Sequence, residues 1–195
     1  ESYSMLGKAW FHTTETEAGR DKYDLVIVDA PASGHVTTLL RVPRAILDVM
    51  PRGPLARDAK LITELLADPR RAAFLAVTLP EELPVRETLD LVRIVRDELA
   101  IPRGPIVVNA VPSPELVDPA LRAVLERTAE PHDDPRIAAT LTGTRALQRR
   151  RVDAEGSMAK LRAEAGAELC ALPRYPVTRL RPEHVDALAR LLGAG

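Results

Sequence analysis

An aspartate at the end of an apolar run is the clearest candidate for chemistry in this sequence. The stretch "YDLVIVDAPASGH", residues 23–35, sets Asp29 directly after four apolar residues, and the small residues Pro31, Ser33 and Gly34 then break regular structure. A continuous apolar run is typical of a parallel strand covered on both faces. Ligands of open α/β sheets bind at the carboxyl ends of such strands, where an acid can hold a metal ion on a phosphate. Asp29 is therefore our candidate metal-binding residue.

The loop that commonly surrounds phosphate groups does not occur in these 195 residues. Such a loop has the spacing G-x-x-x-x-G-K-[ST], in which glycines admit the phosphates and a hydroxyl binds magnesium. The sequence offers only Gly7-Lys8, with Ser2 at the first glycine position and Ala9 at the hydroxyl position. We interpret this pair as a chance dipeptide.

Composition limits the classes of protein that fit. The chain has 46% hydrophobic residues, 27 basic and 28 acidic residues and a net charge of −1, which argues against a protein held mainly on nucleic acid or anionic lipid. A single cysteine, Cys170, excludes an internal disulfide framework and a multi-cysteine zinc site. We find no membrane span and no secretion signal, and so expect a cytoplasmic protein.

Four short apolar runs alternate with longer helical patterns. The runs are "DLVIVDA" (24–30), "AAFLAVTL" (72–79), "PIVVNAV" (105–111) and "AELCALP" (167–173). None alternates cleanly between apolar and polar residues, which predicts parallel strands covered by helices on both faces.

The helices are predicted from apolar spacing and from proline positions. We expect helices over 2–16, from Pro84 to about residue 99, over 135–165 with an irregularity near Gly143 or Gly156, and from Pro182.

The sequence therefore predicts an α/β fold with a partial, doubly wound and mostly parallel sheet flanked by helices. We expect one domain over residues 1–195, with a mainly helical segment at 114–166. The first predicted strand has no apparent partner, and we assume that a strand–helix–strand unit lies upstream.

Three motifs resemble the arsenical pump-driving ATPase family, which includes the ATPases that target tail-anchored membrane proteins. "DAPASGHVTTLLRVP" is similar to the family's D-T-A-P-T-G-H-T-x-R-L-L-x-x-P, although the proline is shifted by one place. "LPEELPVRETLDLV" resembles P-E-x-L-x-x-x-E-T-x-R-L, and "IVVNAV" resembles the family's V-V-N strand. The three motifs occur in the right order over most of residues 23–111.

The resemblance implies a P-loop NTPase-like fold, with ATP and Mg²⁺ as ligands. Asp29 would hold Mg²⁺ through a water molecule, and the backbone N–H of Gly34 would contact the γ-phosphate within a switch over residues 30–38. Asn109 would contact adenine through its amide. The turn that begins at Pro173, "PRYP", resembles the loop that closes over the base.

Two acids and an arginine run have less specific interpretations. Glu81 and Glu87 fall where the family places acids near the nucleotide and the dimer interface, so Glu87 is included among the nucleotide-binding candidates. The run Arg149–Arg151 fits a solvated helix face, with contact to a partner as the alternative. Asp29 has a rival interpretation as a loop-capping acid, and Asn109 as a residue that satisfies backbone groups.

Departures from the family limit the partners that can be expected. The targeting ATPases clamp zinc between subunits with a C-x-x-C pair, which this sequence lacks, so a homodimer would have to be held in another way and we expect no structural zinc. Only about residues 44–70 separate the switch from the next strand, which makes a hydrophobic client groove doubtful. No cysteine set for metalloids is present.

Two functions of different classes follow. The first is the C-terminal portion of an ATP-hydrolysing molecular switch that controls an unknown protein partner; without the phosphate-binding loop the chain alone would be inactive. The second is a non-catalytic binding module with the same fold. A partition or cell-division ATPase is disfavoured because we see neither a basic DNA-binding face nor a membrane helix at the C-terminus.

Overall fold

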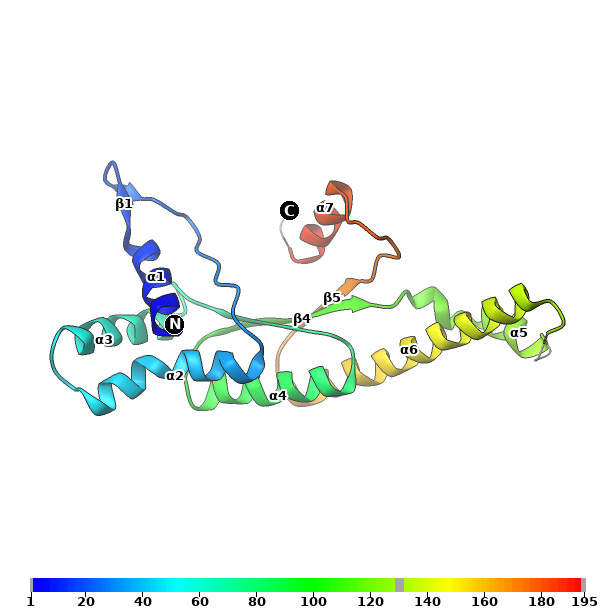
Figure 1. Ribbon diagram of the computed structural model, residues 1–195, viewed down its shortest axis with the longest axis horizontal. Coiled ribbons are helices and arrows are strands. Elements are labelled where there is room, and N and C mark those ends of the chain that lie inside the picture. Colours follow the sequence, from blue (N-terminus) through cyan, green and yellow to red (C-terminus); the bar gives the residue numbers. More distant parts are fainter. Residues whose placement is uncertain (1, 129–131, 194–195) are drawn as a thin grey trace. The chain divides into compact units, whose positions relative to one another are not determined.

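The computed structural model describes residues 2–128 and 132–193 and contains helices, short strands and long connecting segments (Figure 1). Within these residues the elements are α1 Ser2–Thr14, β1 Thr16–Glu17, β2 Arg20–Asp21, α2 Ser33–Val49, α3 Pro54–Ala67, β3 Phe74–Thr78, α4 Glu82–Asp97, β4 Arg103–Val111, η1 Pro114–Val117, α5 Pro119–Arg127, α6 Pro135–Ala165, β5 Leu169–Pro173 and α7 Pro182–Leu191. The chain divides into two compact units. Unit 1 contains Glu1–Phe74 and Asp90–Gly104, and unit 2 contains Leu75–Leu89 and Pro105–Gly195.

Unit 1 is built on three helices that pack against one another. Leu6 of α1, Leu39 of α2 and Ile62 of α3 form one buried cluster, with Trp10 among the partly buried side chains around it. A second cluster joins the last turn of α4 and the following residues to α2 and α3 through Val95, with Leu99 and Ile101 alongside. These apolar contacts stabilise the unit, since burial of aliphatic side chains is the main favourable contribution to folding.

Helix α2 is interrupted in its hydrogen bonding and is then anchored. Pro43 lies inside the helix and is buried, and a proline there removes one N–H donor from the helical ladder. One residue later, the Arg44 guanidinium donates hydrogen bonds to the backbone carbonyls of Glu98 and Leu99, at the end of α4. Arg41 forms an ion pair with the Glu98 side chain. The second half of α2 is therefore fixed to the end of α4.

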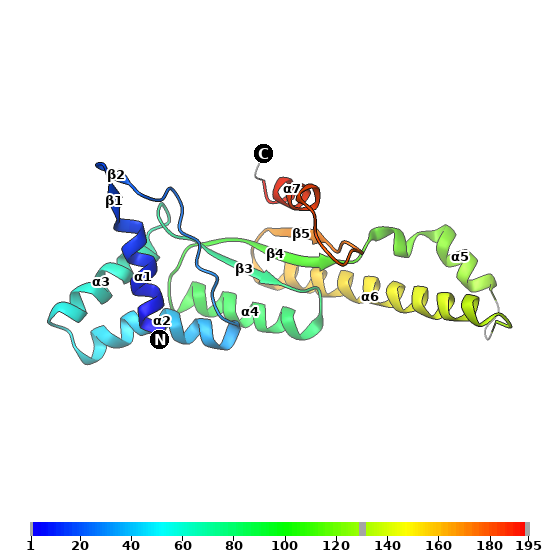
Figure 2. The same cartoon turned by 45° about the horizontal axis from the view of Figure 1, so that its top comes forward.

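Strands β1 and β2 form a short antiparallel hairpin. The other strands form a three-stranded parallel sheet in the order β3–β4–β5, and the chain is an α/β protein. In unit 2, the C-terminal part of α6 lies on one face of the β4–β5 pair and α7 lies over the other (Figures 1 and 2). Ile106, Val107 and Val108 of β4 are all buried. This explains why the apolar run does not alternate with polar residues.

Proline and aspartate begin the helices of unit 2. Asp118 accepts backbone hydrogen bonds from Ala120 and Leu121 at the start of α5, and Asp134 accepts one from Arg136 at the start of α6. Helix α6 ends at Gly166, whose φ of 57° is in the left-handed region that glycine tolerates.

Three of the four predicted strands are confirmed, with bounds that differ by a few residues. The predicted helices are also present. The described residues of the segment 114–166 lie mainly in η1, α5 and α6, and residues 129–131 lie outside the described residues. The predicted irregularity near Gly143 or Gly156 is wrong, because α6 is one helix of 31 residues.

The strand predicted at 24–30 is wrong. Residues 25–30 have no regular secondary structure, and the side chains of Leu25 and Ile27 are 74% and 82% exposed. An apolar run becomes a strand only where a neighbouring strand satisfies its backbone groups. Among the described residues no strand pairs with this segment.

Candidate functional site

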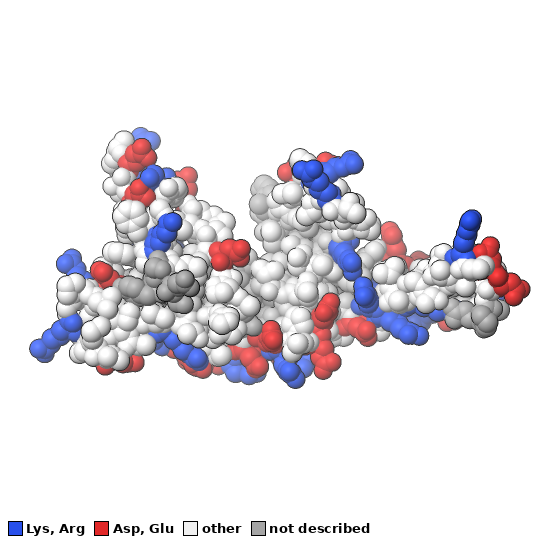
Figure 3. Space-filling model, in the orientation of Figure 1, with Lys and Arg blue, Asp and Glu red and all other residues white. Residues whose placement is uncertain are grey.

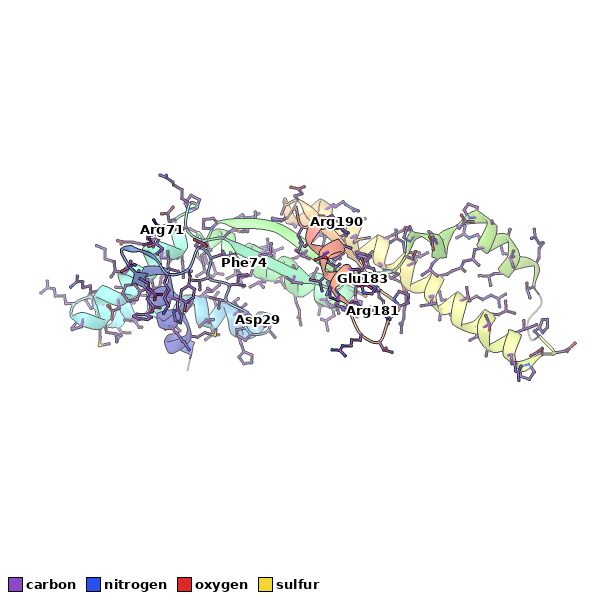
Figure 4. All side chains as sticks on the ribbon, turned by 90° about the horizontal axis from the view of Figure 1, so that it is seen from above. Asp29, Arg71, Phe74, Arg181, Glu183 and Arg190 are labelled. Atoms are coloured by element: carbon purple, nitrogen blue, oxygen red, sulfur yellow. The ribbon has the colours of Figure 1, made fainter. Side chains whose placement is uncertain are left out.

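Asp29 lies in the extended segment that leads into α2 (Figure 4). Its side chain is exposed, and among the residues that the structure describes none donates a hydrogen bond to its carboxylate. The carboxylate can therefore accept a ligand from solvent. Its position at the end of a paired strand, which the sequence predicted, is not found.

Gly34 lies in the first turn of α2, four residues after Ala30, the last residue of the strand predicted at 24–30. The helix begins without a side-chain hydrogen bond at its N-cap residue Ala32, whose carbonyl accepts from the backbone N–H groups of His35 and Val36 at 2.9 and 3.1 Å. The first N–H groups of a helix have no helical partners and can donate to an anion. A Cβ at Gly34 would meet nothing within 4 Å, so the packing around this position does not itself require glycine.

Asn109 projects from a bulge near the carboxyl end of β4. The pairing register with β5 shifts between Val108 and Val111, and Ala110 has a φ of 56°. The side-chain Oδ1 of Asn109 accepts a hydrogen bond of 2.9 Å from the Ala110 backbone N–H. Because a backbone N–H can only donate, this bond fixes the orientation of the amide and leaves the exposed NH₂ group as a donor.

Pro173 lies beside the same bulge. It pairs with Val111, and the backbone N–H of Arg174 donates to the Val111 carbonyl at 2.8 Å. Farther along, the Tyr175 and His184 rings contact each other with centroids 4.8 Å apart. The turn predicted to cover a base is thus attached to β4 at one end and touches α7.

The two glutamates lie on or beside α4. Glu81 and Glu87 are exposed, and the Glu81 carbonyl accepts a hydrogen bond from the Val85 N–H at 3.0 Å, which begins the helix. Their roles near the nucleotide and the dimer interface stay predictions.

The structure therefore brings together one part of the predicted site. Asn109 and Pro173 meet at the carboxyl ends of β4 and β5 in unit 2, where ligands bind in parallel sheets. Asp29 and Gly34 belong to unit 1. The roles of these residues stay predictions.

The residues that could hold magnesium are few. Among the described residues there is no group of three or more His, Cys, Asp or Glu side chains arranged to hold a metal ion. Magnesium bound with a nucleotide commonly uses one or two carboxylates, several waters and phosphate oxygens. A single exposed carboxylate at Asp29 fits that donor set and does not fit a metal site built from protein alone.

Sequence reasoning did not detect two features near Asn109. Nothing in the sequence indicates that Ala110 is left-handed. Arg151, in contrast, had a signal: it lies three residues before Ala154 and seven before Met158, so it shares a helix face with these buried residues. In the structure the Arg151 side chain is only 13% exposed, whereas the neighbouring Arg150 is exposed.

Comparison with known proteins gives partial matches, and no established family profile matches the chain. It is 36% identical over 87 residues to the ATPase BagA of Mycobacterium tuberculosis, and equally to a Mycobacterium bovis protein with the provisional name ATPase Mb3704; the match spans 45% of this chain and 25% of each relative. It is 29% identical over 97 residues to a Halobacterium salinarum protein provisionally named an arsenical pump-driving ATPase, over 15% of that protein. The chain thus matches a quarter or less of the length of these relatives.

The surface carries charges of both signs. Figure 3 shows basic and acidic side chains near one another at several places, while most of the face drawn is formed by other residues. Within the part of the chain that the structure describes, no helix is both long and apolar enough to cross a bilayer.

Proposed function

We propose that this chain is part of an ATP-binding and ATP-hydrolysing switch protein whose nucleotide state controls a protein partner. The observation that carries the proposal is the exposed amide of Asn109, which a bulge holds beside the Pro173 turn at the carboxyl edge of a parallel sheet. The similarity to proteins named ATPases supports it.

In this proposal Asn109 and the Pro173 turn recognise the base. The NH₂ group of Asn109 donates to an acceptor atom on adenine, and the turn from Pro173 to Pro176 covers the ring. Adenine offers ring nitrogens as acceptors, so it suits an amide whose oxygen already binds the Ala110 N–H.

The phosphate contacts are assigned to Asp29 and the start of α2. Asp29 holds Mg²⁺ through a water molecule, and the uncapped N–H groups at the start of α2, including that of Gly34, donate to phosphate oxygen. Bound magnesium supplies positive charge that stabilises the phosphate oxygens during transfer. The phosphate-binding loop itself would come from polypeptide outside these 195 residues.

The switch would consist of residues 30–38. In the structure these residues span the end of the extended segment and the first turns of α2. Phosphate contacts at the start of a helix can order such a segment, and loss of the γ-phosphate releases it. A protein partner that contacts α2 would then sense the nucleotide.

The first test uses the natural polypeptide, purified whole, and measures magnesium-dependent ATP turnover. Asp29→Asn should lower turnover by about 10- to 100-fold, as expected for a group that orients a metal's water, while leaving the thermal unfolding midpoint nearly unchanged. Asp24→Asn, an exposed acid of the same segment, is the matched control and should retain activity.

Two other results would contradict the proposed function. Equal activity in the Asp29→Asn and Asp24→Asn variants would remove Asp29 from the site. Complete absence of ATP binding by the natural polypeptide would favour the non-catalytic binding module.

A further inference from the structure

The arginine run on α6 contains one residue that is bound quite differently from its neighbours. Arg149 and Arg150 are exposed, whereas the Arg151 guanidinium donates from Nη1 to the Pro112 carbonyl at 2.9 Å. Its Nε and Nη2 lie 3.1 and 2.9 Å from Oε1 of Glu155, one helical turn along α6. The carboxylate thereby fixes the plane of the guanidinium, as in paired arginine–carboxylate contacts generally.

The carbonyl that Arg151 binds belongs to the segment immediately after the Asn109 bulge. Two successive carbonyls of this segment have partners from elsewhere in unit 2: Val111 accepts from the Arg174 N–H at 2.8 Å, and Pro112 accepts from Arg151. Beyond them, η1 packs against α6. The end of β4 is therefore held from the β5 side and from the α6 side.

Such support is needed because the bulge is strained. A non-glycine residue at positive φ, here Ala110 at 56°, persists only where surrounding contacts determine its conformation. The conformation of Ala110 directs its N–H to the side chain of Asn109. The hydrogen bonds that fix residues 111 and 112 therefore also influence the orientation of the Asn109 amide group.

We propose that Arg151 is a positioning residue for base recognition, acting through the Pro112 carbonyl on Asn109 and linking α6 to the bound nucleotide. The inference rests on the proposed ATP-binding function. It assigns a role to one member of the arginine run and leaves Arg149 and Arg150 as solvated residues. It also implies that the base contact and the position of α6 influence each other, because linkage between two such states is reciprocal.

Helix α6 provides a closely matched control. Arg145 donates to the Leu125 carbonyl at 2.8 Å, so it too fastens α6 to a backbone carbonyl of an earlier segment, far along the chain from the bulge. Arg145→Met removes a fastening of the same chemical kind, and Arg150→Met removes an exposed charge. Arg151→Met can be compared with both.

The experiment measures dissociation constants of Mg·ATP, Mg·GTP and inorganic tripolyphosphate for the natural polypeptide by titration calorimetry. We expect Arg151→Met to weaken ATP by about three- to tenfold, the loss of roughly one oriented hydrogen bond, with tripolyphosphate unchanged. Arg145→Met and Arg150→Met should leave all three constants unchanged, even if Arg145→Met lowers thermal stability. Arg151→Lys, which keeps one donor, should restore part of the loss.

A double variant tests the route through Asn109. If Arg151 acts on Asn109, Arg151→Met should add little to the weakening caused by Asn109→Ala, because the two changes remove the same contact. Full additivity would overturn the inference, as would equal effects of Arg151→Met and Arg145→Met on ATP, or equal weakening of ATP and tripolyphosphate. If Arg151→Met does not fold, Arg151→Lys and Glu155→Gln carry the same comparisons.

Failure of the underlying function gives a different result. In that case the unaltered polypeptide does not bind ATP, or Asn109→Ala binds it as well as the unaltered protein does. If ATP binds and depends on Asn109 but not on Arg151, only the positioning role is overturned.

Discussion

Two apolar runs with similar sequences have different structures in this chain. "DLVIV" at residues 24–28 is unpaired, and its Ile27 side chain is 82% exposed; "PIVVN" at 105–109 forms the middle strand of the sheet, and its Val108 is fully buried. Composition does not distinguish them. The second run has strands on both sides and the first has none among the described residues. Strand formation therefore depends on partners, which local sequence does not specify.

The largest expected effect is on the free energy of unfolding, which should depend on the buried run at 105–109 and hardly on the exposed run at 24–28. Ile106→Ala should lower the free energy of unfolding by about 2–5 kcal/mol, because it empties space in a buried strand. Ile27→Ala should change it by no more than about 0.5 kcal/mol, as for exposed positions generally. Denaturant unfolding of the two variants measures both values; if Ile106→Ala does not fold, Ile106→Val should still cost about 0.5–1.5 kcal/mol.

The variants Ile27→Ala and Ile106→Ala can also be compared in the natural polypeptide. A cost for Ile27→Ala near that of Ile106→Ala would show that residues 24–28 are buried there and have acquired a partner strand. In the 195-residue chain the same result would contradict the exposed position of Ile27.

Most of the fold followed from local signals, and the site followed only in part. Val107 and its neighbours in β4 and the proline starts of α6 and α7 were predictable because an apolar run or a helix start is encoded within a few residues. The roles of Asn109 and the Pro173 turn were implied by the family resemblance, and the structure places the two near each other at the ends of β4 and β5. The left-handed Ala110 did not follow, because its conformation depends on contacts from α6 and β5.

A smaller effect is expected at Gly34, where stability and ligand binding should respond in opposite directions. Gly34→Ala has open space for the added Cβ and lies in a helix, so it should stabilise the chain by about 0.4–1 kcal/mol. In the natural polypeptide it should lower ATP affinity, because the methyl group obstructs close approach of the γ-phosphate. Calorimetric scans and nucleotide titrations measure the two effects; Gly143→Ala, also in open space within a helix, is the control for stability alone. Unchanged ATP affinity would remove Gly34 from the proposed phosphate contact.

The smallest effect concerns the exposed hairpin of β1 and β2. A hydrogen bond from Lys22, and then one from His12, lower the pKa of Glu15 below its ordinary value of 4.5, and the bond to Glu15 raises the pKa of Lys22 above 10.5. The Glu15 contribution to stability is thus complete above pH 4.5 and is lost as pH falls through the lowered pKa; that of Lys22 is complete below pH 10.5 and is lost as pH rises through the raised pKa. NMR titration of the Glu15 carboxyl should show the lowered pKa, and Lys22→Met should return it toward 4.5. An unchanged titration in Lys22→Met would contradict the pairing.

The proline in α2 has a mechanical consequence. About ten residues separate the start of the helix at Ser33 from Pro43, a length of about 15 Å at the helical rise. The missing hydrogen bond at Pro43 lowers the cost of bending there, while Arg44 keeps the following turns attached to the end of α4. A bend of about 10° at this pivot would carry the helix start through about 2.5 Å. A small change in the bend angle of α2 at Pro43 would therefore move Gly34 by a distance comparable to the size of an atom.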